Sequence, residues 1–343
     1  MSGPRLGILT SGGDCPGLNA VIRSAFIRLT REHGGELVGF RAGWKGVRDD
    51  DAIAVDESLT RGIAGTGGTV LGTSRTNPVD NGGVSQVRET IKRRCLDGLL
   101  AVGGEGSLAA AAALARAGIP VIGVPKTIDN DLRGTDYTFG FDTAVQIATD
   151  AIDRLGTTGT SHTRCMVAEV MGRHSGWIAL HAGIATGAQA ILVPEQPVPF
   201  DRLIGWIASA RARGESAVVV VAEGYPLPGA DGVYAPRGSA ADGRPRLGGI
   251  GEQLASMIEA ATGIETRATT LGHIQRGGTP TAYDRVLAAR FGAAAVDAAA
   301  VAGWGQMVSL AGEDITLCPI EAAVGSTKMI TSARYERAAV CFG

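Results

Sequence analysis

The chain has 343 residues and a net charge of −2, and charged residues make up 19% of it. A near-neutral charge balance gives no indication of a nucleic-acid or polyanionic partner. No apolar run reaches the ~18 residues that a membrane-spanning helix needs. The five cysteines are scattered without metal-ligand spacing, so we expect reduced thiols in a cytoplasm. The N-terminus runs straight into a predicted strand, which predicts no signal peptide, and the length favours two domains.

Short apolar runs alternate along the chain with stretches of helical periodicity. Strands are predicted at residues 5–10, 36–41, 97–102, 120–123, 163–170, 190–193, 217–222 and 268–271. Helices are predicted at about 19–32, 84–94, 107–117, 141–155, 176–186, 200–213, 252–261 and 283–301. A turn is predicted at 43–46, and loops at the Gly/Thr-rich 63–75 and the Gly/Pro-rich 224–249. This alternation is typical of parallel sheets with right-handed crossovers.

Several predicted strands end in glycine followed by polar residues. Gly12-Gly13-Asp14 follows one strand, and Gly103-Gly104-Glu105-Gly106-Ser107 follows another. Glycine at a strand–helix turn lets backbone N–H groups approach a phosphate, and the helix N-terminus adds partial positive charge. Neither turn is a Walker loop, and each alone is as well explained by tight packing of helix on strand. Together they favour a nucleotide or polyphosphate cleft.

The segment Lys126-Thr127-Ile128-Asp129-Asn130-Asp131 concentrates reactive groups directly after a predicted strand. Ligands of open parallel sheets bind beyond the carboxyl ends of the strands, so we expect Lys126, Thr127, Asp129 and Asp131 at the rim of a cleft. A lone carboxylate there is usually a turn former or a helix cap, but here a donor, a potential base and a spare carboxylate lie within six residues. Glu105 and Asp131 could help to hold Mg²⁺, with helix capping as the alternative for Glu105.

Four arginines lie next to or within predicted strand ends: Arg164, Arg173, Arg267 and Arg276. Arginine matches phosphate oxygens in bidentate geometry. Any one of them alone is better explained by a surface ion pair, but four, with His273 close to Arg276, predict an anion site suited to a sugar phosphate. Glu223 could accept a sugar hydroxyl or cap its turn.

Five motifs together resemble the 6-phosphofructokinase family, in its bacterial mixed-substrate group and ATP-dependent type. They are Gly-Gly-Asp-Cys-Pro-Gly-Leu-Asn-Ala (12–20), Gly-Gly-Glu-Gly-Ser (103–107), Pro-Lys-Thr-Ile-Asp-Asn-Asp (125–131), Met-Gly-Arg (171–173) and Leu-Gly-His-Ile-Gln-Arg-Gly-Gly (271–278). The resemblance implies an α/β fold of two similar Rossmann-like three-layer α/β/α domains, with mainly parallel sheets and the active site in the cleft between them. We expect a phosphoryl-donor-binding domain at 1–140 plus about 275–325, and a fructose-6-phosphate-binding domain at 141–274 plus about 326–343.

The resemblance also implies a glycolytic, Mg²⁺-dependent transfer of a phosphoryl group to the 1-hydroxyl of fructose 6-phosphate. Its implied catalytic residues are Asp129 as general base, Thr127 and Arg173. The implied donor and cofactor residues are Gly13, Arg75, Thr76, Glu105, Gly106, Ser107 and Leu108. Glu105 stands where the family usually has an aspartate associated with Mg²⁺. The implied sugar-phosphate residues are Thr127, Ile128, Asp129, Arg164, Met171, Gly172, Arg173, Glu223, Arg267, His273, Ile274, Gln275 and Arg276. Arg164 and Arg267 match arginines that reach in from a neighbouring subunit, which implies a homo-oligomer, a dimer or a tetramer.

Two positions give opposite indications of the phosphoryl donor. In this family glycine at the position of Gly106 goes with ATP, whereas lysine at the position of Lys126 is usual in pyrophosphate-using members. We expect ATP, because steric exclusion of a nucleotide discriminates more strongly than one added ammonium. The alternatives are a pyrophosphate-dependent phosphofructokinase and a non-catalytic relative of the same fold. A NAD kinase or lipid kinase is disfavoured by the motifs at 125–131 and 271–278.

Overall fold

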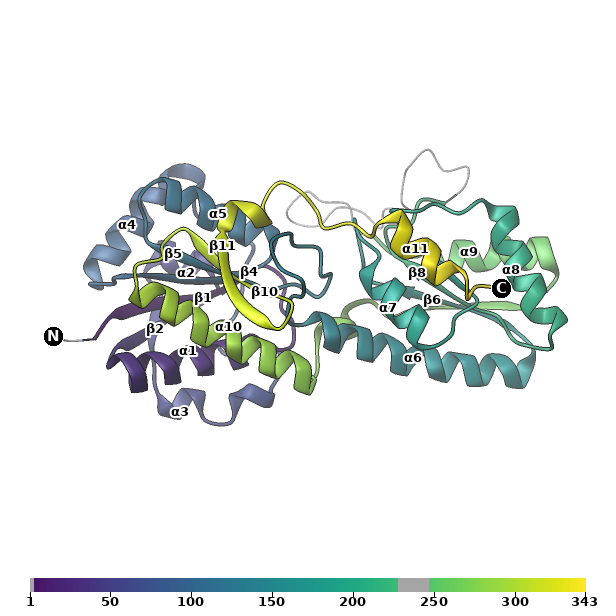
Figure 1. Ribbon diagram of the computed structural model, residues 1–343, viewed down its shortest axis with the longest axis horizontal. Helices are drawn as coiled ribbons and strands as arrows, with labels where there is room; N and C mark the ends of the chain where they lie inside the picture. Colours follow the sequence, from purple (N-terminus) through teal and green to yellow (C-terminus); the bar gives the residue numbers. More distant parts are fainter. Residues whose placement is uncertain (1–2, 228–246) are drawn as a thin grey trace. The chain divides into compact units, whose positions relative to one another are not determined.

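The computed structural model describes residues 3–227 and 247–343 (Figure 1). It divides into two compact units, Met1–Thr143 with Arg276–Thr327 and Ala144–Gln275 with Lys328–Gly343. Each unit contains one sheet flanked by helices, and most strand pairs are parallel, so the predicted α/β class is confirmed. Most of the predicted loop 224–249, at residues 228–246, lies outside the described residues.

The first unit is built on a seven-stranded sheet in the order β11-β10-β5-β4-β1-β2-β3. Its strands are β1 (Arg5–Ser11), β2 (Glu36–Phe40), β3 (Ala52–Val55), β4 (Gly98–Gly103), β5 (Val121–Pro125), β10 (Gln306–Ala311) and β11 (Asp314–Pro319). Only the two edge strands, β3 and β11, pair in antiparallel fashion within this described sheet. Its helices are α1 (Leu18–His33), α2 (Trp44–Asp49), α3 (Glu57–Thr60), α4 (Gly83–Arg93), α5 (Glu105–Arg116) and α10 (Ala282–Ala300). Helices α1 and α10 lie side by side on one face, and α2, α4 and α5 cover the other (Figure 1).

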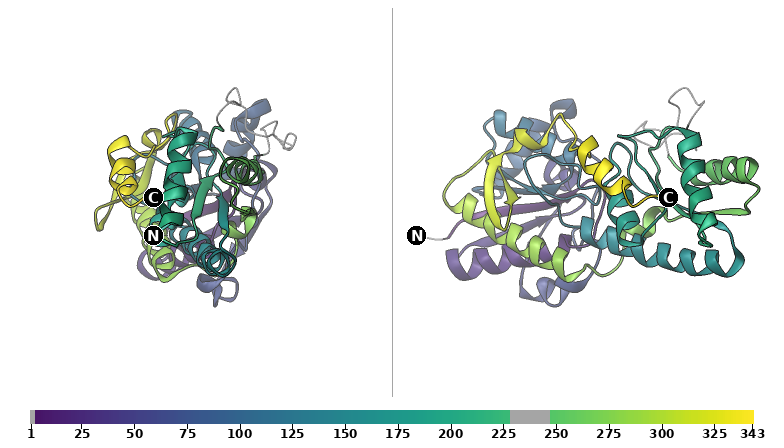
Figure 2. Two further views of the ribbon diagram at one scale, coloured as in Figure 1. Left: turned by 90° about the vertical axis from the view of Figure 1, so that its right-hand side faces the viewer. Right: turned by 45° about the vertical axis from the view of Figure 1, so that its right-hand side comes forward.

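The second unit has a four-stranded, fully parallel sheet in the order β7-β8-β6-β9. Its strands are β6 (Cys165–Val170), β7 (Ala190–Leu192), β8 (Val218–Ala222) and β9 (Thr266–Thr270). Its helices are α6 (Phe141–His162), which begins in the first unit, α7 (Trp177–Ala185), α8 (Phe200–Ala212), α9 (Ile250–Thr262) and α11 (Ser332–Ala339). Helices α6 and α7 pack on one face of the sheet and α8 and α9 on the other (Figure 2).

The central strands are apolar because helices cover both of their faces. Strand β8 has the sequence Val-Val-Val-Val-Ala and is buried at every position, which is typical of a parallel strand between two helical layers. In the first unit, every residue of β4 and β5 is buried as well. The polar groups of these elements are therefore confined to the turns that follow the strands.

Several elements differ from the sequence-based expectation. Helix α2 occupies the region of the predicted turn at 43–46, and α6 continues to His162 rather than ending near 155. Strands β3, β10 and β11 and helix α11 have no counterpart among the predictions. The two antiparallel edge strands are short or largely exposed, so they lack the continuous apolar run that marks the central strands. Within the part of the chain that the structure describes, no helix has the length and apolar character to cross a lipid bilayer.

Candidate functional site

Three turns of the first unit meet at the carboxyl edge of its sheet. Ser11 of β1 pairs with Gly103 of β4, and Gly103 pairs with Pro125 of β5. The backbone N–H of Lys126 donates to the carbonyl oxygen of Gly103 at 3.0 Å. The turns that begin at Gly12, Gly104 and Lys126 are therefore neighbours, although about 90 residues of sequence separate the first two.

The first turn is joined to a loop from elsewhere in the sequence. Gly12 has a φ of +87°, which favours glycine, and its N–H donates to the carbonyl of Ser74 at 2.9 Å. The hydroxyl of Thr73 donates to the carbonyl of Gly12 at 2.6 Å. These two bonds hold the exposed Arg75 and the neighbouring Thr76 close to the turn. A side chain at Gly13 would place its Cβ 2.5 Å from Nη1 of Arg276.

Arg276, which is expected to bind the sugar phosphate, lies beside the first turn. Its guanidinium lies over the bare backbone of Gly13. The guanidinium therefore adds positive charge beside a turn that the sequence assigns to the phosphoryl donor.

In the second turn, the two residues after Gly104 are exposed and the next two are buried. Glu105 and Gly106 are exposed at the start of α5, whereas Ser107 and Leu108 are buried. A Cβ added to Gly106 would have no atom within 4 Å, so open space lies beside this residue. The carbonyl of Ser107 accepts the indole N–H of Trp44 at 3.3 Å. The exposed backbone and the carboxylate of Glu105 are what this turn offers to a ligand.

Lys126 lies beneath the first turn rather than at a rim. Its side chain is 4% exposed, and its ammonium donates to the carbonyl oxygen of Gly13. Burial lowers the pKa of Lys126, as does the charge of Arg276, while Asp14 and Asp129 act in the opposite direction. The predicted rim position of Lys126 is therefore wrong, because its side chain is buried and its ammonium is hydrogen-bonded to the backbone of the glycine turn.

The segment that carries Asp129 has a shape set by local hydrogen bonds. The N–H of Asp129 donates to the hydroxyl of Thr127 at 3.1 Å, and the hydroxyl of Thr138 donates to the carbonyl of Thr127 at 2.8 Å. Asn130 has a φ of +49°, and its Oδ1 accepts the N–H of Thr138 at 3.2 Å. Asn130 and Thr138 were not among the predicted site residues; the only local signal is the tolerance of asparagine for this left-handed conformation. Asp129 and Asp131 are half-buried.

The acidic side chains near these turns are compatible with a Mg²⁺ ion that also binds phosphate oxygens. Among residues 3–227 and 247–343, no three His, Cys, Asp or Glu side chains form a metal-binding group. Mg²⁺ in phosphoryl-transfer sites commonly takes one or two carboxylates and completes its coordination with phosphates and water. The exposed Glu105 carboxylate at the N-terminus of α5 suits that arrangement.

The carboxyl edge of the second unit joins three further turns. The N–H of Glu223 donates to the carbonyl of Val170 at 2.8 Å, and that of Leu271 donates to the carbonyl of Glu169 at 2.9 Å. A Cβ on Gly224 would lie 1.9 Å from the carbonyl oxygen of Arg173, so only glycine fits there. These contacts bring together the residues that follow β6, β8 and β9, namely Met171, Gly172, Arg173, Glu223, His273, Ile274 and Gln275.

The side chains on this edge differ in exposure. His273 and Ile274 are exposed and Arg173 and Glu223 are half-buried, whereas Met171 is 8% and Gln275 0% exposed. The sequence predicts that Gln275 contacts the sugar phosphate, but its side chain is fully buried.

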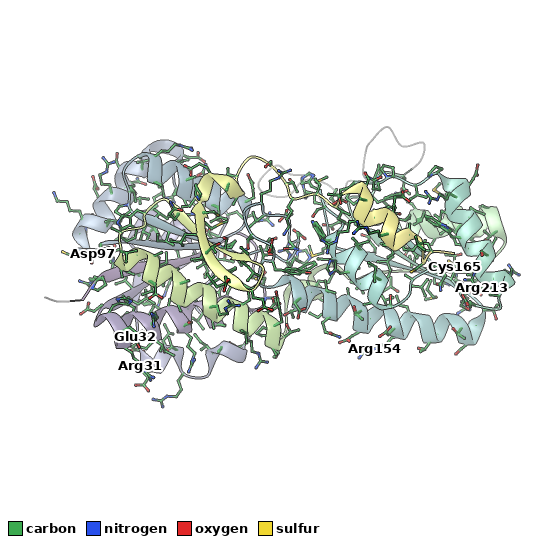
Figure 3. The ribbon with its side chains drawn as sticks, viewed as in Figure 1. Arg31, Glu32, Asp97, Arg154, Cys165 and Arg213 are labelled. Atoms are coloured by element: carbon green, nitrogen blue, oxygen red, sulfur yellow. The ribbon has the colours of Figure 1, made fainter. Side chains whose placement is uncertain are left out.

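Arg164 and Arg267 lie at the opposite, amino edge of the same sheet. Arg164 directly precedes Cys165, the first residue of β6, which is labelled in Figure 3, and Arg267 is the second residue of β9. Nε of Arg164 lies 2.8 Å from a carboxylate oxygen of Glu265, and Arg267 pairs with the same carboxylate. The guanidinium of Arg164 beside Glu265 lowers the pKa of that carboxyl. At roughly 3.3 Å per residue, β6 separates these arginines from Arg173 by roughly 20 Å.

Within the second sheet of one copy, Arg164 and Arg267 therefore lie at the opposite edge from Arg173, which follows the carboxyl end of β6. Because all of these strands run parallel, no local adjustment moves an arginine from one edge to the other.

A parallel sheet that gathers glycine turns, a helix N-terminus and cationic side chains at its carboxyl edge is an arrangement of α/β proteins that bind phosphorylated ligands. The family model described as Phosphofructokinase matches residues 5–299. The chain belongs to this family, so the expected resemblance is confirmed and phosphofructokinase activity is supported.

The relatives include users of both donors. The "Pyrophosphate--fructose 6-phosphate 1-phosphotransferase" of Amycolatopsis methanolica is 52% identical over 99% of this chain and 100% of its own length. The "ATP-dependent 6-phosphofructokinase 3" of Streptomyces coelicolor is 49% identical over 97% of this chain and 98% of its own. Among solved structures, Pichia pastoris phosphofructokinase in the T-state matches with a TM-score of 0.81 and 29% identity, covering 94% of this chain and 35% of that one.

Proposed function

We propose that this chain transfers a phosphoryl group from ATP to the 1-hydroxyl of fructose 6-phosphate in the cytoplasm, forming fructose 1,6-bisphosphate and ADP. The observation that carries the choice of donor is the open space beside Gly106, where a Cβ would meet no atom. Glycine leaves that space for the rest of a nucleotide, whereas an aspartate would extend into it. Lys126, the residue that favoured pyrophosphate, does not oppose this choice. Its ammonium is buried and hydrogen-bonded to the backbone of Gly13 rather than presented to a ligand.

In the proposed reaction Asp129 is the general base. Its carboxylate accepts the proton of the 1-hydroxyl as the sugar oxygen attacks the terminal phosphorus, and the bond from phosphorus to the bridging oxygen breaks, releasing ADP. The rate depends mainly on alignment and on neutralisation of charge. The bonds of Thr127 and Asn130 to Thr138 fix the backbone on which Asp129 stands. Arg173 would supply charge from the sugar-phosphate side.

Mg²⁺ would be held at the donor side by Glu105 together with phosphate oxygens. When bound, the ion neutralises phosphate charge. Glu105 is a longer side chain than the aspartate usual in the family, and its exposed position at the start of α5 leaves it free to adopt a rotamer that reaches a cation directly or through water. Asp131 is the second candidate ligand.

We also propose a homo-oligomer in which Arg164 and Arg267 serve the site of a neighbouring copy. Their placement at the amino edge of the second sheet, roughly 20 Å along β6 from Arg173, supports this arrangement. A dimer or a tetramer would satisfy it if the amino edge of one copy meets the carboxyl edge of another at its interface.

The second candidate donor is pyrophosphate, which is favoured by the 52% identity to a protein named for that activity. Initial rates of fructose 1,6-bisphosphate formation with MgATP and with Mg-pyrophosphate, at matched fructose 6-phosphate, separate the two. We expect turnover with ATP to dominate. If only pyrophosphate supports turnover, pyrophosphate and not ATP is the donor. If neither donor supports turnover, the chain is better explained as a non-catalytic relative of the same fold.

A further inference from the structure

The backbone ladder between β6 and β9 stops just before the residues assigned to the sugar phosphate. Glu169 and Thr270 are its last paired residues, and the final backbone bond runs from the N–H of Leu271 to the carbonyl of Glu169 at 2.9 Å. After Leu271 the chain turns through Gly272, which has a φ of +52°, into a single 3-10 turn at Gly272–Arg276. The two strands therefore need another connection at this point if their carboxyl ends are to keep a fixed spacing.

The side chain of Gln275 makes that connection. Its Oε1 accepts the backbone N–H of Met171 at 3.3 Å, and its Nε2 donates to the carbonyl of Gly272 at 3.0 Å. The side chain is 0% exposed. Because a backbone N–H only donates and a carbonyl only accepts, these two partners also determine which way the amide is oriented.

We infer that Gln275 is a positioning residue that holds Met171–Arg173 and the turn Gly272–Gln275 at a fixed separation. This inference rests on the proposed function, since it assigns the two segments to fructose 6-phosphate. The buried amide of Gln275 acts on substrate affinity through its neighbours. It binds the N–H of Met171, two residues before Arg173, and it closes the turn that carries the exposed His273. Direct contact with the sugar is not part of its role.

The second unit contains a matched control for this arrangement. Gln189 accepts the N–H of Val218 with its Oε1 at 2.7 Å and donates to the carbonyl of Gly187 through its Nε2 at 3.2 Å. Gln275 likewise joins the N–H of Met171, directly after β6, to the carbonyl of a turn, although Gln189 is half-buried and Gln275 fully buried. Val218 is the first residue of β8, so this bridge lies at the amino edge, away from the turns that follow the strands.

The test compares Gln275→Leu and Gln275→Glu with Gln189→Leu and Gln189→Glu in the full-length protein. We expect Gln275→Leu to raise the KM for fructose 6-phosphate about tenfold or more, the scale of a lost buried hydrogen-bond pair, while the KM for ATP changes by less than about twofold. Gln189→Leu should leave both constants within about twofold. Amide hydrogen exchange at Met171, measured without any substrate, should accelerate in Gln275→Leu and stay unchanged in Gln189→Leu.

The glutamate variant separates hydrogen bonding from packing. In Gln275→Glu the ionised side chain accepts from the N–H of Met171 but has no proton for the carbonyl of Gly272, whereas the protonated acid makes both bonds. The KM of Gln275→Glu relative to wild type should therefore fall as the pH is lowered from 8 to 6. The inference is overturned if Gln275→Leu leaves the KM for fructose 6-phosphate unchanged, raises both KM values alike, or leaves exchange at Met171 unchanged. Inactivity of the wild type would instead count against the proposed function, and the exchange measurement would still decide the role of Gln275.

Discussion

The two sheets present their functional groups in different ways. In the first unit, the turns after three adjacent strands, β1, β4 and β5, collect at one edge and bring Gly13, Glu105, Gly106 and Asp129 to it. In the second unit, the residues assigned to one sugar phosphate are divided between opposite edges. The residues proposed for the phosphoryl donor therefore lie together at one edge within a single copy, whereas those proposed for the sugar phosphate do not.

The largest effect is expected in the first unit, at Asp129. Asp129→Asn keeps the size of the side chain but removes the base, so turnover should fall by about 10² or more, the scale of general-base catalysis. The KM for fructose 6-phosphate should change little. Steady-state kinetics measures both constants.

Asp136→Asn is the control for that variant. Asp136 is exposed, and its carboxylate accepts the N–H of Gly312 at 2.7 Å, a bond that an asparagine oxygen can retain. Normal turnover in Asp129→Asn, or an equal loss in Asp136→Asn, would remove Asp129 from the proposed mechanism.

The divided edges of the second unit predict complementation between two inactive variants. Asp129→Asn and Arg164→Ala should each be poorly active alone. When they are mixed, dissociated and reassociated, a site that takes Asp129 from one copy and Arg164 from another is intact in about one case in four, so activity should approach about a quarter of the wild-type value.

The matching control mixes Asp129→Asn with Arg173→Ala. The proposed reaction takes both residues from the same copy, so every site in this mixture keeps at least one defect. Failure of the Arg164 mixture to recover activity would mean that Arg164 serves the site of its own copy or no site at all.

Gly106→Asp tests the open space in the first unit. The added carboxylate would occupy room proposed for the nucleotide and repel its phosphates, so kcat/KM for ATP should fall by about tenfold or more, while use of pyrophosphate falls less. Parallel assays with the two donors measure the ratio. Gly205→Asp, which also introduces a side chain where no atom lies within 4 Å, should leave the ratio unchanged; a similar loss with both donors in Gly106→Asp would argue against nucleotide exclusion.

The smallest effect on catalysis, but a measurable one on stability, is expected at Asp284. This carboxyl is buried at the start of α10, accepts both the N–H and the hydroxyl of Thr143, and burial raises its pKa from 3.8 to about 6. The folded state therefore binds this proton more tightly than the unfolded state. The stabilisation is fully present below about pH 4 and is lost as the pH rises to 6.

Denaturant titrations at several pH values measure this loss. The free energy of unfolding of the wild type, relative to Asp284→Asn, should decrease by about 3 kcal/mol between pH 4 and pH 7, given ~1.4 kcal/mol for each tenfold change in proton affinity. Asp150→Asn, at an exposed carboxyl that accepts from Gln146, should show no such trend. A pH-independent difference for Asp284→Asn would mean that this carboxyl titrates normally in the folded protein.

Much of the fold follows from sequence pattern because the central strands are short apolar runs that end in glycine. Strands β1, β4, β5, β6 and β8 lie within about two residues of their predicted positions. Strands β3 and β11 were missed because each pairs on one side only and keeps polar or exposed residues. Each pairs only with the strand that precedes it in the sequence, so its outer side meets no second strand and needs no continuous apolar run.

Sequence alone determined the family, the order of the motifs and the residue types that phosphoryl transfer requires, because these depend on glycine, carboxylate and arginine at short, local spacings. Tertiary structure alone decided where those groups point. It buried Lys126 beneath Gly13, placed Arg276 over the same turn, enclosed Gln275 between two strand ends and put Arg164 and Arg267 at the opposite edge from Arg173. The physical reason is that burial and hydrogen-bond partners arise from segments that approach one another only when the sheets assemble, and strand direction then decides which edge each side chain can reach.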